Sequence, residues 1–178
     1  MDDHDQQRLI LGLYETALAP ERLEGYLDTV RATTGCGCLA VFFQDRRDVR
    51  LVVGATSGWK DGWIERYVDE FAGMSPFYTA SLRAGGRDLG RFMLGDEIVP
   101  REELVKTAYY NEFLLPSGWT QSDGGTFFAE GSGRGVISTG RSERQGPCPP
   151  ETLALYQSLM PHLRSEEHTS ELQSLLII

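Results

Sequence analysis

The sequence predicts an α+β fold, an antiparallel sheet of about five strands that is flanked by helices. The first indication is the order of the periodic segments, which runs helix, helix, hairpin, helix, helix, hairpin, helix. The second is the length of 178 residues, which suits one domain, with 40% apolar and 24% charged residues. We therefore expect one domain that is built on a single sheet.

The first half of the chain contains three predicted helices and one hairpin. Apolar residues recur every three or four positions in residues 5–18 and again after Pro20, up to Gly35. Strand-forming residues fill 38–44 and 47–55, and the polar turn between them indicates a hairpin. Aromatic residues at helical spacing in 59–71 predict a third helix, which Pro76 ends.

The second half repeats this alternation. Residues 91–99 are apolar enough for an edge strand, and 100–114 begin with a proline and acidic residues, as helices do. Two strands, 119–130 and 134–142, form a second hairpin, in which we expect positive φ at Gly133 or a neighbouring residue. A final helix follows over 151–164.

Charge and hydropathy exclude two classes of partner. The net charge is −9, the isoelectric point is near 4.8, and the basic residues are scattered along the chain. A surface that grips phosphates would instead carry a basic patch, so direct binding to nucleic acid is not expected. No apolar run approaches the ~20 residues that span a bilayer, and the N-terminus is acidic. We expect a cytoplasmic protein that does not enter a membrane.

The sequence offers no catalytic or metal motif, so we expect no enzyme, no metal and no cofactor. His4 lies at the terminus, His162 next to a proline, and His168 near the C-terminus. The glycine-rich strings "GSGRG" at 131–135 and "GATSG" at 54–58 miss the spacings of a phosphate loop and of a nucleophile elbow. The cysteines, at 36, 38 and 148, lack further ligands at metal-binding spacing and are expected to be buried thiols.

Aromatic residues are the most suggestive feature for binding. At helical spacing they most often form core, and that alternative stays open. The functional alternative is a cavity between helices and sheet, in which a mostly apolar ligand is oriented by tyrosine hydroxyls, tryptophan N–H groups or an arginine. The candidate ligand-binding residues are Trp59, Trp63, Arg66, Tyr67, Phe71, Tyr109, Tyr110 and Trp119.

Two segments carry a resemblance to a known family. The stretches "VPREELVKTAYYNEFLLPSGW" (99–119) and "LALYQSLMPHLR" (153–164) resemble the N-terminal sensor-like domain of bacterial LuxR-type transcriptional regulators. The stretch "YVDEFAGMSPFY" (67–78) is similar to a third region of that family, with Ser75 where asparagine is common. The resemblance implies that residues 1–164 form a PAS/GAF-like sensory domain.

The resemblance also implies a role. The domain would sense an unidentified small-molecule effector or a partner, would be able to form a homodimer, and would contact DNA only through a C-terminal helix-turn-helix that this chain lacks. The alternatives are a GAF/PAS-like sensor module of another signalling protein, a small stand-alone binding domain, and a small enzyme.

The last 14 residues differ in character from the rest. The string "RSEEHTSELQS", which begins at Arg164, resembles the translation of a common sequencing-library adapter. We therefore expect residues 165–178 to be a non-native, adapter-derived tail, which stands where the family's linker and DNA-binding domain would begin. Such a segment is left out of fold reasoning, and His168 with it.

Overall fold

The computed structural model describes residues 3–45, 47, 51–84 and 87–164. The predicted tail, 165–178, which contains His168, lies outside the described residues. Within the described ranges, no helix is both long enough and apolar enough to cross a membrane.

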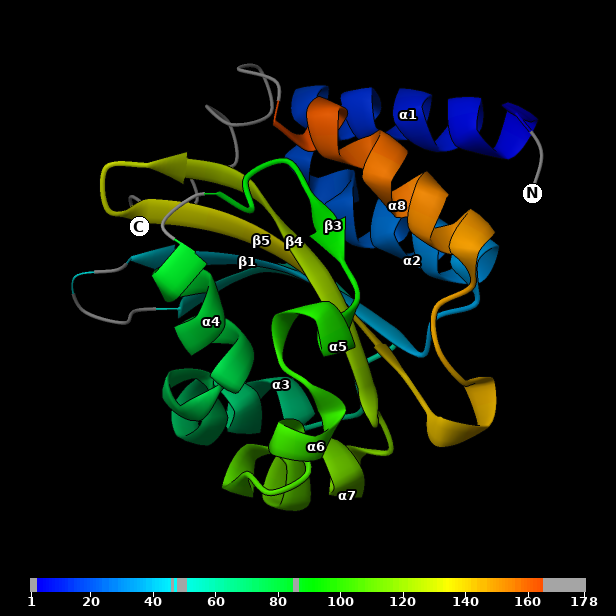
Figure 1. The fold of residues 1–178 in the computed structure, drawn as a ribbon. Helices are drawn as coiled ribbons and strands as arrows, with labels where there is room; N and C mark the ends of the chain where they lie inside the picture. Colours follow the sequence, from blue (N-terminus) through cyan, green and yellow to red (C-terminus); the bar gives the residue numbers. More distant parts are fainter. Residues whose placement is uncertain (1–2, 46, 48–50, 85–86, 165–178) are drawn as a thin grey trace.

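A five-stranded sheet forms the centre of the molecule, in the order β2-β1-β5-β4-β3, and every neighbouring pair is antiparallel (Figure 1). The strands are β1 (Cys38–Asp45), β2 (Leu51–Ser57), β3 (Phe92–Met93), β4 (Gln121–Glu130) and β5 (Gly133–Arg141). The predicted α+β fold is confirmed, and so are both hairpins. The positive φ of the second hairpin falls on Gly131, at 55°.

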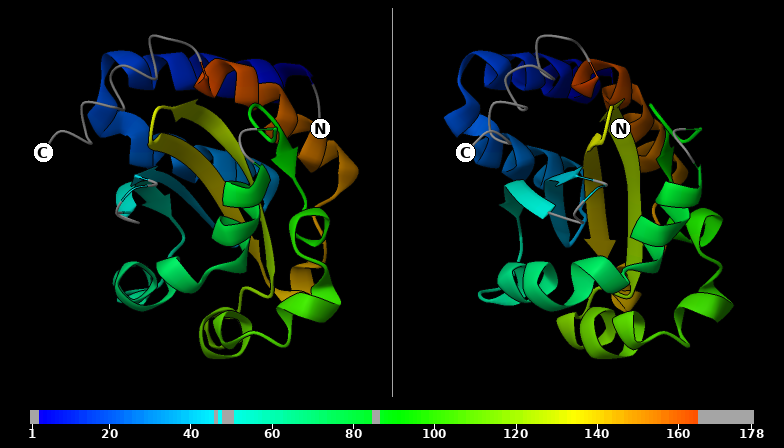
Figure 2. Two further views of the ribbon diagram at one scale, coloured as in Figure 1. Left: turned by 60° about the vertical axis from the view of Figure 1, so that its left-hand side comes forward. Right: turned by 90° about the vertical axis from the view of Figure 1, so that its left-hand side faces the viewer.

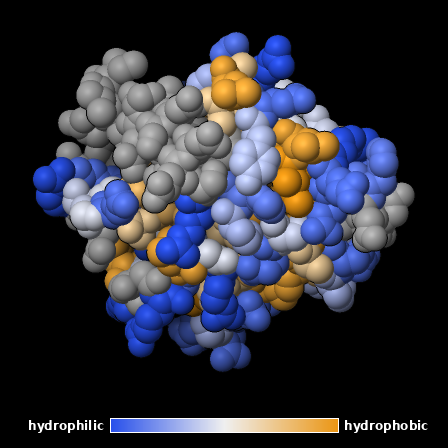
Figure 3. Space-filling model, turned by 90° about the horizontal axis from the view of Figure 1, so that it is seen from above, coloured by the Kyte–Doolittle hydropathy of each residue, from blue (hydrophilic) through white to orange (hydrophobic). Residues whose placement is uncertain are grey.

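Three long helices cover one face of the sheet, and α1 lies across the other two (Figures 1 and 2). They are α1 (Asp3–Leu18), α2 (Leu23–Thr34) after a short 3₁₀ turn η1 (Pro20–Arg22), and α8 (Pro150–Leu163) after a second one, η5 (Glu143–Gln145). Leu13, Val30 and Met160 pack here against Phe43 and Phe127 of the sheet. Figure 3, which looks onto this layer, shows separate hydrophobic patches bordered by hydrophilic side chains.

Short helices cover the opposite face (Figure 2). In chain order they are α3 (Trp63–Arg66), the π-helical turn η2 (Tyr67–Phe71), the 3₁₀ turn η3 (Ala72–Met74), α4 (Pro76–Ala84), α5 (Gly95–Ile98), α6 (Arg101–Leu104), the π-helical turn η4 (Tyr109–Leu114) and α7 (Leu115–Ser117). Their aromatic side chains form a second core with Ala40 and Phe42 of β1.

The helix predicted over 59–71 is shorter and less regular than expected. Regular helix begins only at Trp63, after Gly62, whose φ of 76° is outside the helical region. Pro76 ends the segment as predicted, but it also begins α4, a helix that was not predicted. Proline suits the first turn of a helix, because its fixed φ is helical and no N–H is needed there.

The helix predicted over 100–114 is interrupted. Its first part, α6, ends at Leu104, residues 105–107 are not helical, and the helix resumes at Ala108, directly before η4. The Thr107 side chain explains the break, because its hydroxyl donates to Leu104 O at 2.7 Å and accepts from Tyr110 N at 3.1 Å. Threonine hydroxyls that bond to the local backbone compete with helical hydrogen bonding.

The edge strand predicted over 91–99 is reduced to the two residues of β3. The chain then turns at Gly95 into α5. A Cβ atom at Gly95 would collide with the carbonyl oxygen of Ser122, so glycine permits this close approach of β4. The edge is therefore short, as protected sheet edges commonly are.

Candidate functional site

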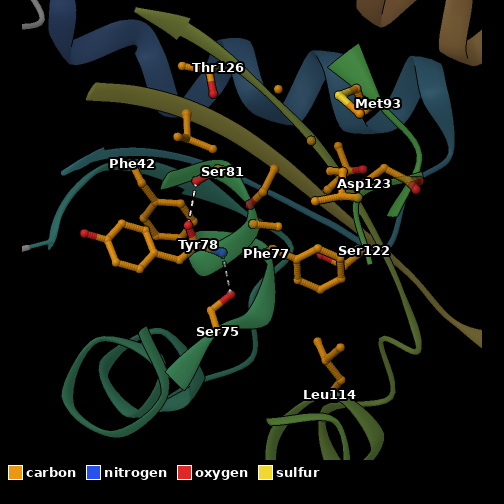
Figure 4. Close-up of a pocket in the computed structure, with 18 of the residues that line it drawn as sticks. Phe42, Ser75, Phe77, Tyr78, Ser81, Met93, Leu114, Ser122, Asp123 and Thr126 are labelled. Carbon is orange, nitrogen blue, oxygen red and sulfur yellow. Dashed lines mark hydrogen bonds between the residues drawn. The ribbon is translucent and has the colours of Figure 1, made fainter. Parts of the chain in front are cut away.

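A cavity of about 270 Å³ lies between the sheet and the layer of short helices (Figure 4). Its lining residues run from Cys38 to Gln44 along β1 and from Arg134 to Gly140 along β5. Six residues of strand correspond to about 20 Å, at roughly 3.3 Å per residue. The cavity is therefore elongated along the strands, and its volume is near the lower end of the range for small-molecule sites, roughly 300–1,000 Å³.

Small side chains on one face of the sheet make room for the cavity. Successive residues of a strand point to opposite faces. On β4 and β5 the cavity face carries Ser122, Gly124, Ser138 and Gly140, while the opposite face carries large residues such as Ile137. Serine and glycine at alternate positions in "QSDGG" and "ISTG" thus leave the space that the cavity occupies.

Aromatic rings form one end of the cavity. The rings of Trp59 and Trp119 meet edge to face, with centroids 4.9 Å apart, and Tyr67 lies 5.4 Å from Phe113. Trp59 is fixed in orientation, because its Nε1 donates a hydrogen bond of 3.2 Å to Leu39 O. This end presents flat apolar surfaces to any ligand.

A buried group of hydroxyls lies between this end and the middle of the cavity. Ser75 is 2% exposed and makes hydrogen bonds with the side chains of Tyr67 and Tyr109. Burial raises the pKa of Tyr67 to about 12, and it also raises the pKa of Tyr109. All three groups are therefore uncharged at neutral pH and can donate or accept hydrogen bonds.

An ion pair forms the other end. Asp88 Oδ2 lies 2.6 Å from Arg134 Nη2, and the two side chains are only 16% and 5% exposed. Thr126 Oγ1 donates to the same carboxylate oxygen at 3.0 Å, and Arg134 also contacts the Thr126 hydroxyl. A buried pair of this kind is tolerated when further hydrogen bonds satisfy its members. Gln44 lies opposite Arg134 in the strand register and completes this end.

No protein-family model and no curated protein matches the chain, but solved structures do. The LBD domain of VqsR from Pseudomonas aeruginosa is 19% identical, with a TM-score of 0.68 over 96% of each chain. CepR2 from Burkholderia cenocepacia, described as an N-acylhomoserine lactone dependent LuxR family transcription factor, is 11% identical. Its TM-score is 0.64, over 94% of this chain and 98% of that one.

A third similar structure is that of a GAF domain/HD domain protein from Geobacter sulfurreducens. It is 14% identical, with a TM-score of 0.60, and the match covers 93% of this chain and 99% of that one. The fold is that of GAF and LuxR-type ligand-binding domains. The predicted GAF-like fold is therefore confirmed.

In this GAF-like domain, four of the eight sequence-predicted binding residues line the cavity, namely Trp59, Tyr67, Tyr109 and Trp119. The other four do not line it, and two of them, Phe71 and Trp63, lie behind its aromatic wall. Phe71 stacks on Phe113 with centroids 5.2 Å apart, and Trp63 lies 5.7 Å from the same ring. The assignment of the four as ligand contacts stays a prediction. For Phe71 and Trp63, the packing against Phe113 does not favour it.

The predicted arginine and the last tyrosine also point elsewhere. The Arg66 guanidinium lies 5.3 Å from the Trp63 ring on the outer side, and its Nε is 3.3 Å from Glu70 Oε2. The Tyr110 hydroxyl accepts a hydrogen bond of 3.0 Å from Arg101 Nη2. Neither side chain lines the cavity.

Sequence reasoning missed the polar residues of the cavity, chiefly Ser75, Tyr78, Asp88 and Arg134. One signal was present in the sequence. Arg134 shares a strand face with Val136 and Ser138, and a charged residue at that position of a buried strand requires a partner. The partner, Asp88, is 46 residues away, so no local pattern identifies it.

The titratable groups that line the cavity are few. None of the histidines in the described part of the chain lines the cavity, and the described residues contain no group of three His, Cys, Asp or Glu side chains that could hold a metal ion. Burial raises the pKa of the Cys38 thiol, which keeps it protonated and weakly nucleophilic. The arrangement can enclose a slender molecule and orient its polar groups.

Proposed function

We propose that this chain is the ligand-sensing domain of a LuxR-type transcriptional regulator. The observation that carries the proposal is the elongated cavity, apolar at one end and polar at the other, within a fold shared with LuxR-type ligand-binding domains. A ligand that binds two conformations of the domain unequally shifts the balance between them. The domain acts by binding and not by catalysis.

The contacts of α8 support a route from the cavity to an output. Asp88, Arg91 and Met93 line the cavity, and the same segment is attached to the last helix. Gln157 Oε1 accepts from Phe92 N, and Gln157 Nε2 donates to Gly90 O, both at 2.9 Å. A ligand that displaces β3 therefore displaces α8, the helix from which the chain leaves the domain.

The attached output in this proposal is a helix-turn-helix, which binds DNA. The intact regulator in this proposal is cytoplasmic and works as a homodimer. The chain itself is too acidic to grip DNA. In the same proposal residues 165–178 are adapter-derived. The runner-up is a GAF-like sensor module of another signalling protein, which the similarity to the Geobacter sulfurreducens GAF domain favours.

Sequencing the source gene beyond the codon for Leu163 tests the output. An in-frame helix-turn-helix supports the regulator, a kinase or cyclic-dinucleotide enzyme supports the runner-up, and an early stop codon contradicts both.

The sensing step is tested by titrating the full chain with N-octanoylhomoserine lactone while tryptophan emission is recorded. Trp59 and Trp119 line the cavity, so a bound ligand is expected to give a saturable change in emission. The variant Ser138→Phe, which fills the floor of the cavity, should abolish that change while the circular dichroism spectrum is retained. A saturable response that survives in this variant would place the ligand elsewhere.

A further inference from the structure

The outer face of α1 carries apolar side chains that are open to solvent. Leu11 is 65% exposed and Leu18 is 88% exposed, and residues seven apart lie on the same face of a helix. Figure 1 shows α1 on the outside of the long-helix layer, with α2 and α8 beneath it. A stripe of this kind on a surface helix is suited to packing against another helix.

An open groove lies beside this stripe, between α1 and α2. Its volume is about 710 Å³, and its lining residues include Leu11, Gly12 and Gly25. A Cβ atom at Gly25 would have nothing within 4 Å, whereas one at Gly12 would lie 3.3 Å from the Tyr26 ring. Packing within the described chain therefore accounts for Gly12 but not for Gly25, although glycine lowers the stability of a helix.

The shape of this surface favours a second copy of the same surface as the partner. A protruding leucine and an open groove lie next to each other, so two copies related by a two-fold axis can each insert Leu11 into the groove of the other. A symmetric contact of this kind uses one patch twice. Each side chain in the patch therefore contributes twice to the association.

The charges on the same face set the direction of the two helices. Arg8 and Glu15 are both exposed, both line the groove, and lie seven residues apart on one face of α1. Arg8 Nη2 is 3.1 Å from Asp5 Oδ1, whereas Glu15 is in none of the ion pairs of the described residues. Antiparallel α1 helices bring each Arg8 opposite Glu15 of the partner subunit, whereas parallel helices bring like charges together.

Charge and shape agree on the point where the two helices cross. The midpoint between Arg8 and Glu15 falls between residues 11 and 12. At this place Leu11 protrudes, and Gly12, without a side chain, lets a second helix come close. Two independent observations, one of charge and one of shape, therefore give the same register.

We infer that a second copy of this chain packs on this surface, with the two α1 helices antiparallel. Leu11 of each copy lies against Gly12 of the partner subunit, and each Arg8 pairs with Glu15 of the partner subunit. The inference rests on the proposed function, whose homodimer it supplies with a surface, and that surface lies on the side of the sheet opposite the cavity. A contact centred on one pair of helices is smaller than the roughly 1,600 Å² of a standard interface, so we expect a weak dimer.

Sedimentation velocity of the full chain, from micromolar to millimolar concentration, tests for this dimer. The sedimentation coefficient should rise with concentration as the 19.9 kDa monomer associates. Leu11→Ser should raise the dissociation constant about 10-fold or more, because each copy loses an apolar contact. Leu115→Ser is the matched control and should leave the dissociation constant unchanged, because Leu115 is 51% exposed but belongs to α7, on the other side of the sheet. Both positions are exposed, so the circular dichroism spectrum should be retained.

Charge reversal tests the antiparallel register. Arg8→Glu alone and Glu15→Arg alone each place like charges opposite each other at two symmetry-related positions, and each should raise the dissociation constant about 10–30-fold. The double variant Arg8→Glu/Glu15→Arg restores opposite charges at both positions, so its dissociation constant should return to within about 3-fold of the wild-type value. Arg8→Glu also removes the hydrogen bonds from Arg8 to Asp5 and Thr33, so thermal unfolding is recorded for every variant.

The outcomes separate this inference from the sensing function. A chain that stays monomeric at all concentrations, or a dimer that Leu11→Ser leaves unchanged, overturns the inference. Weakening by both single reversals without recovery in the double variant overturns the antiparallel arrangement and with it the inference as stated. Tryptophan emission during ligand titration reports the cavity on the other face, so a saturable response in Leu11→Ser supports sensing whatever the association state of that variant.

Discussion

At the scale of single residues, the hydroxyl of Ser75 organises the inner wall of the cavity. Ser75 is buried, it makes hydrogen bonds with the side chains of Tyr67 and Tyr109, and it also accepts from Tyr78 N. Three hydroxyls therefore share hydrogen bonds in a region otherwise built of rings. Burial disfavours the charged form of both tyrosines, and the hydrogen bonds from Ser75 offset this only in part.

Alkaline pH should expose this dependence. Tyrosine ionises near pH 10 in the unfolded chain, whereas Tyr67 in the folded state has a pKa of about 12. The raised value contributes stability that is complete below pH 10 and is lost as the pH rises to about 12. Between pH 8 and pH 11, the unfolding free energy of Tyr67→Phe should therefore fall by about 1 kcal/mol less than that of the wild-type protein. Urea unfolding at the two pH values measures this, and equal losses in both proteins would contradict it.

At the scale of elements, the two-residue strand β3 pairs with β4 and is also attached to α8. The Phe92 ring stacks on Tyr156 with centroids 4.4 Å apart, and Gln157 closes two hydrogen bonds on the backbone of Gly90 and Phe92. The segment joins the cavity to the last helix. In the proposed sensing function it is the element through which a change in the cavity reaches the end of the domain.

Gln157→Leu should release this attachment while the fold is retained. The loss of two hydrogen bonds is expected to destabilise the domain by about 1–3 kcal/mol and to speed hydrogen exchange at the Phe92 amide, which donates to Gln157. Ser158→Ala is the matched control, because the Ser158 hydroxyl bonds only within its own helix, to Leu155 O. Exchange at β3 that is equally fast in the two variants would count against the attachment.

The predicted and observed elements differ where side-chain contacts outweigh the periodicity of the local sequence. Residues 5–18, 38–44 and 151–164 follow simple periodicities, and each of them forms close to the predicted bounds. The breaks occur at Thr107 and in the π-helical turn η2, where hydrogen bonds and ring packing replace the regular helix. A π-helical turn holds more residues than an α-helical one, so residues three apart no longer share a face.

At the scale of the whole molecule, one sheet separates two cores. Leu13 and Met160 belong to the core on the side of the long helices, and Trp59 and Trp63 pack against the core on the cavity side. Each core packs against one face of the sheet, and both depend on the same five strands. The two halves should therefore unfold together, as small single domains usually do.

Leu13→Ala provides the test of this coupling. Leu13 is 1% exposed and belongs to the core opposite the tryptophans, and its truncation should cost about 2–5 kcal/mol. Urea unfolding followed by tryptophan fluorescence, which reports the cavity side, and by circular dichroism should shift by the same amount. A fluorescence transition that remained at the wild-type midpoint would show that the two cores unfold separately.

The sequence by itself determined the fold class, most of the strands and the long helices, because period and turn chemistry act between residues that are close along the chain. It also identified aromatic residues around a cavity, and four of the eight candidates line one. Only the tertiary structure decided which rings face the cavity and which lie behind its wall, since this depends on strand register and on irregular helical turns. The same holds for the pairing of Asp88 with Arg134, 46 residues apart, because chain topology alone brings those two side chains together.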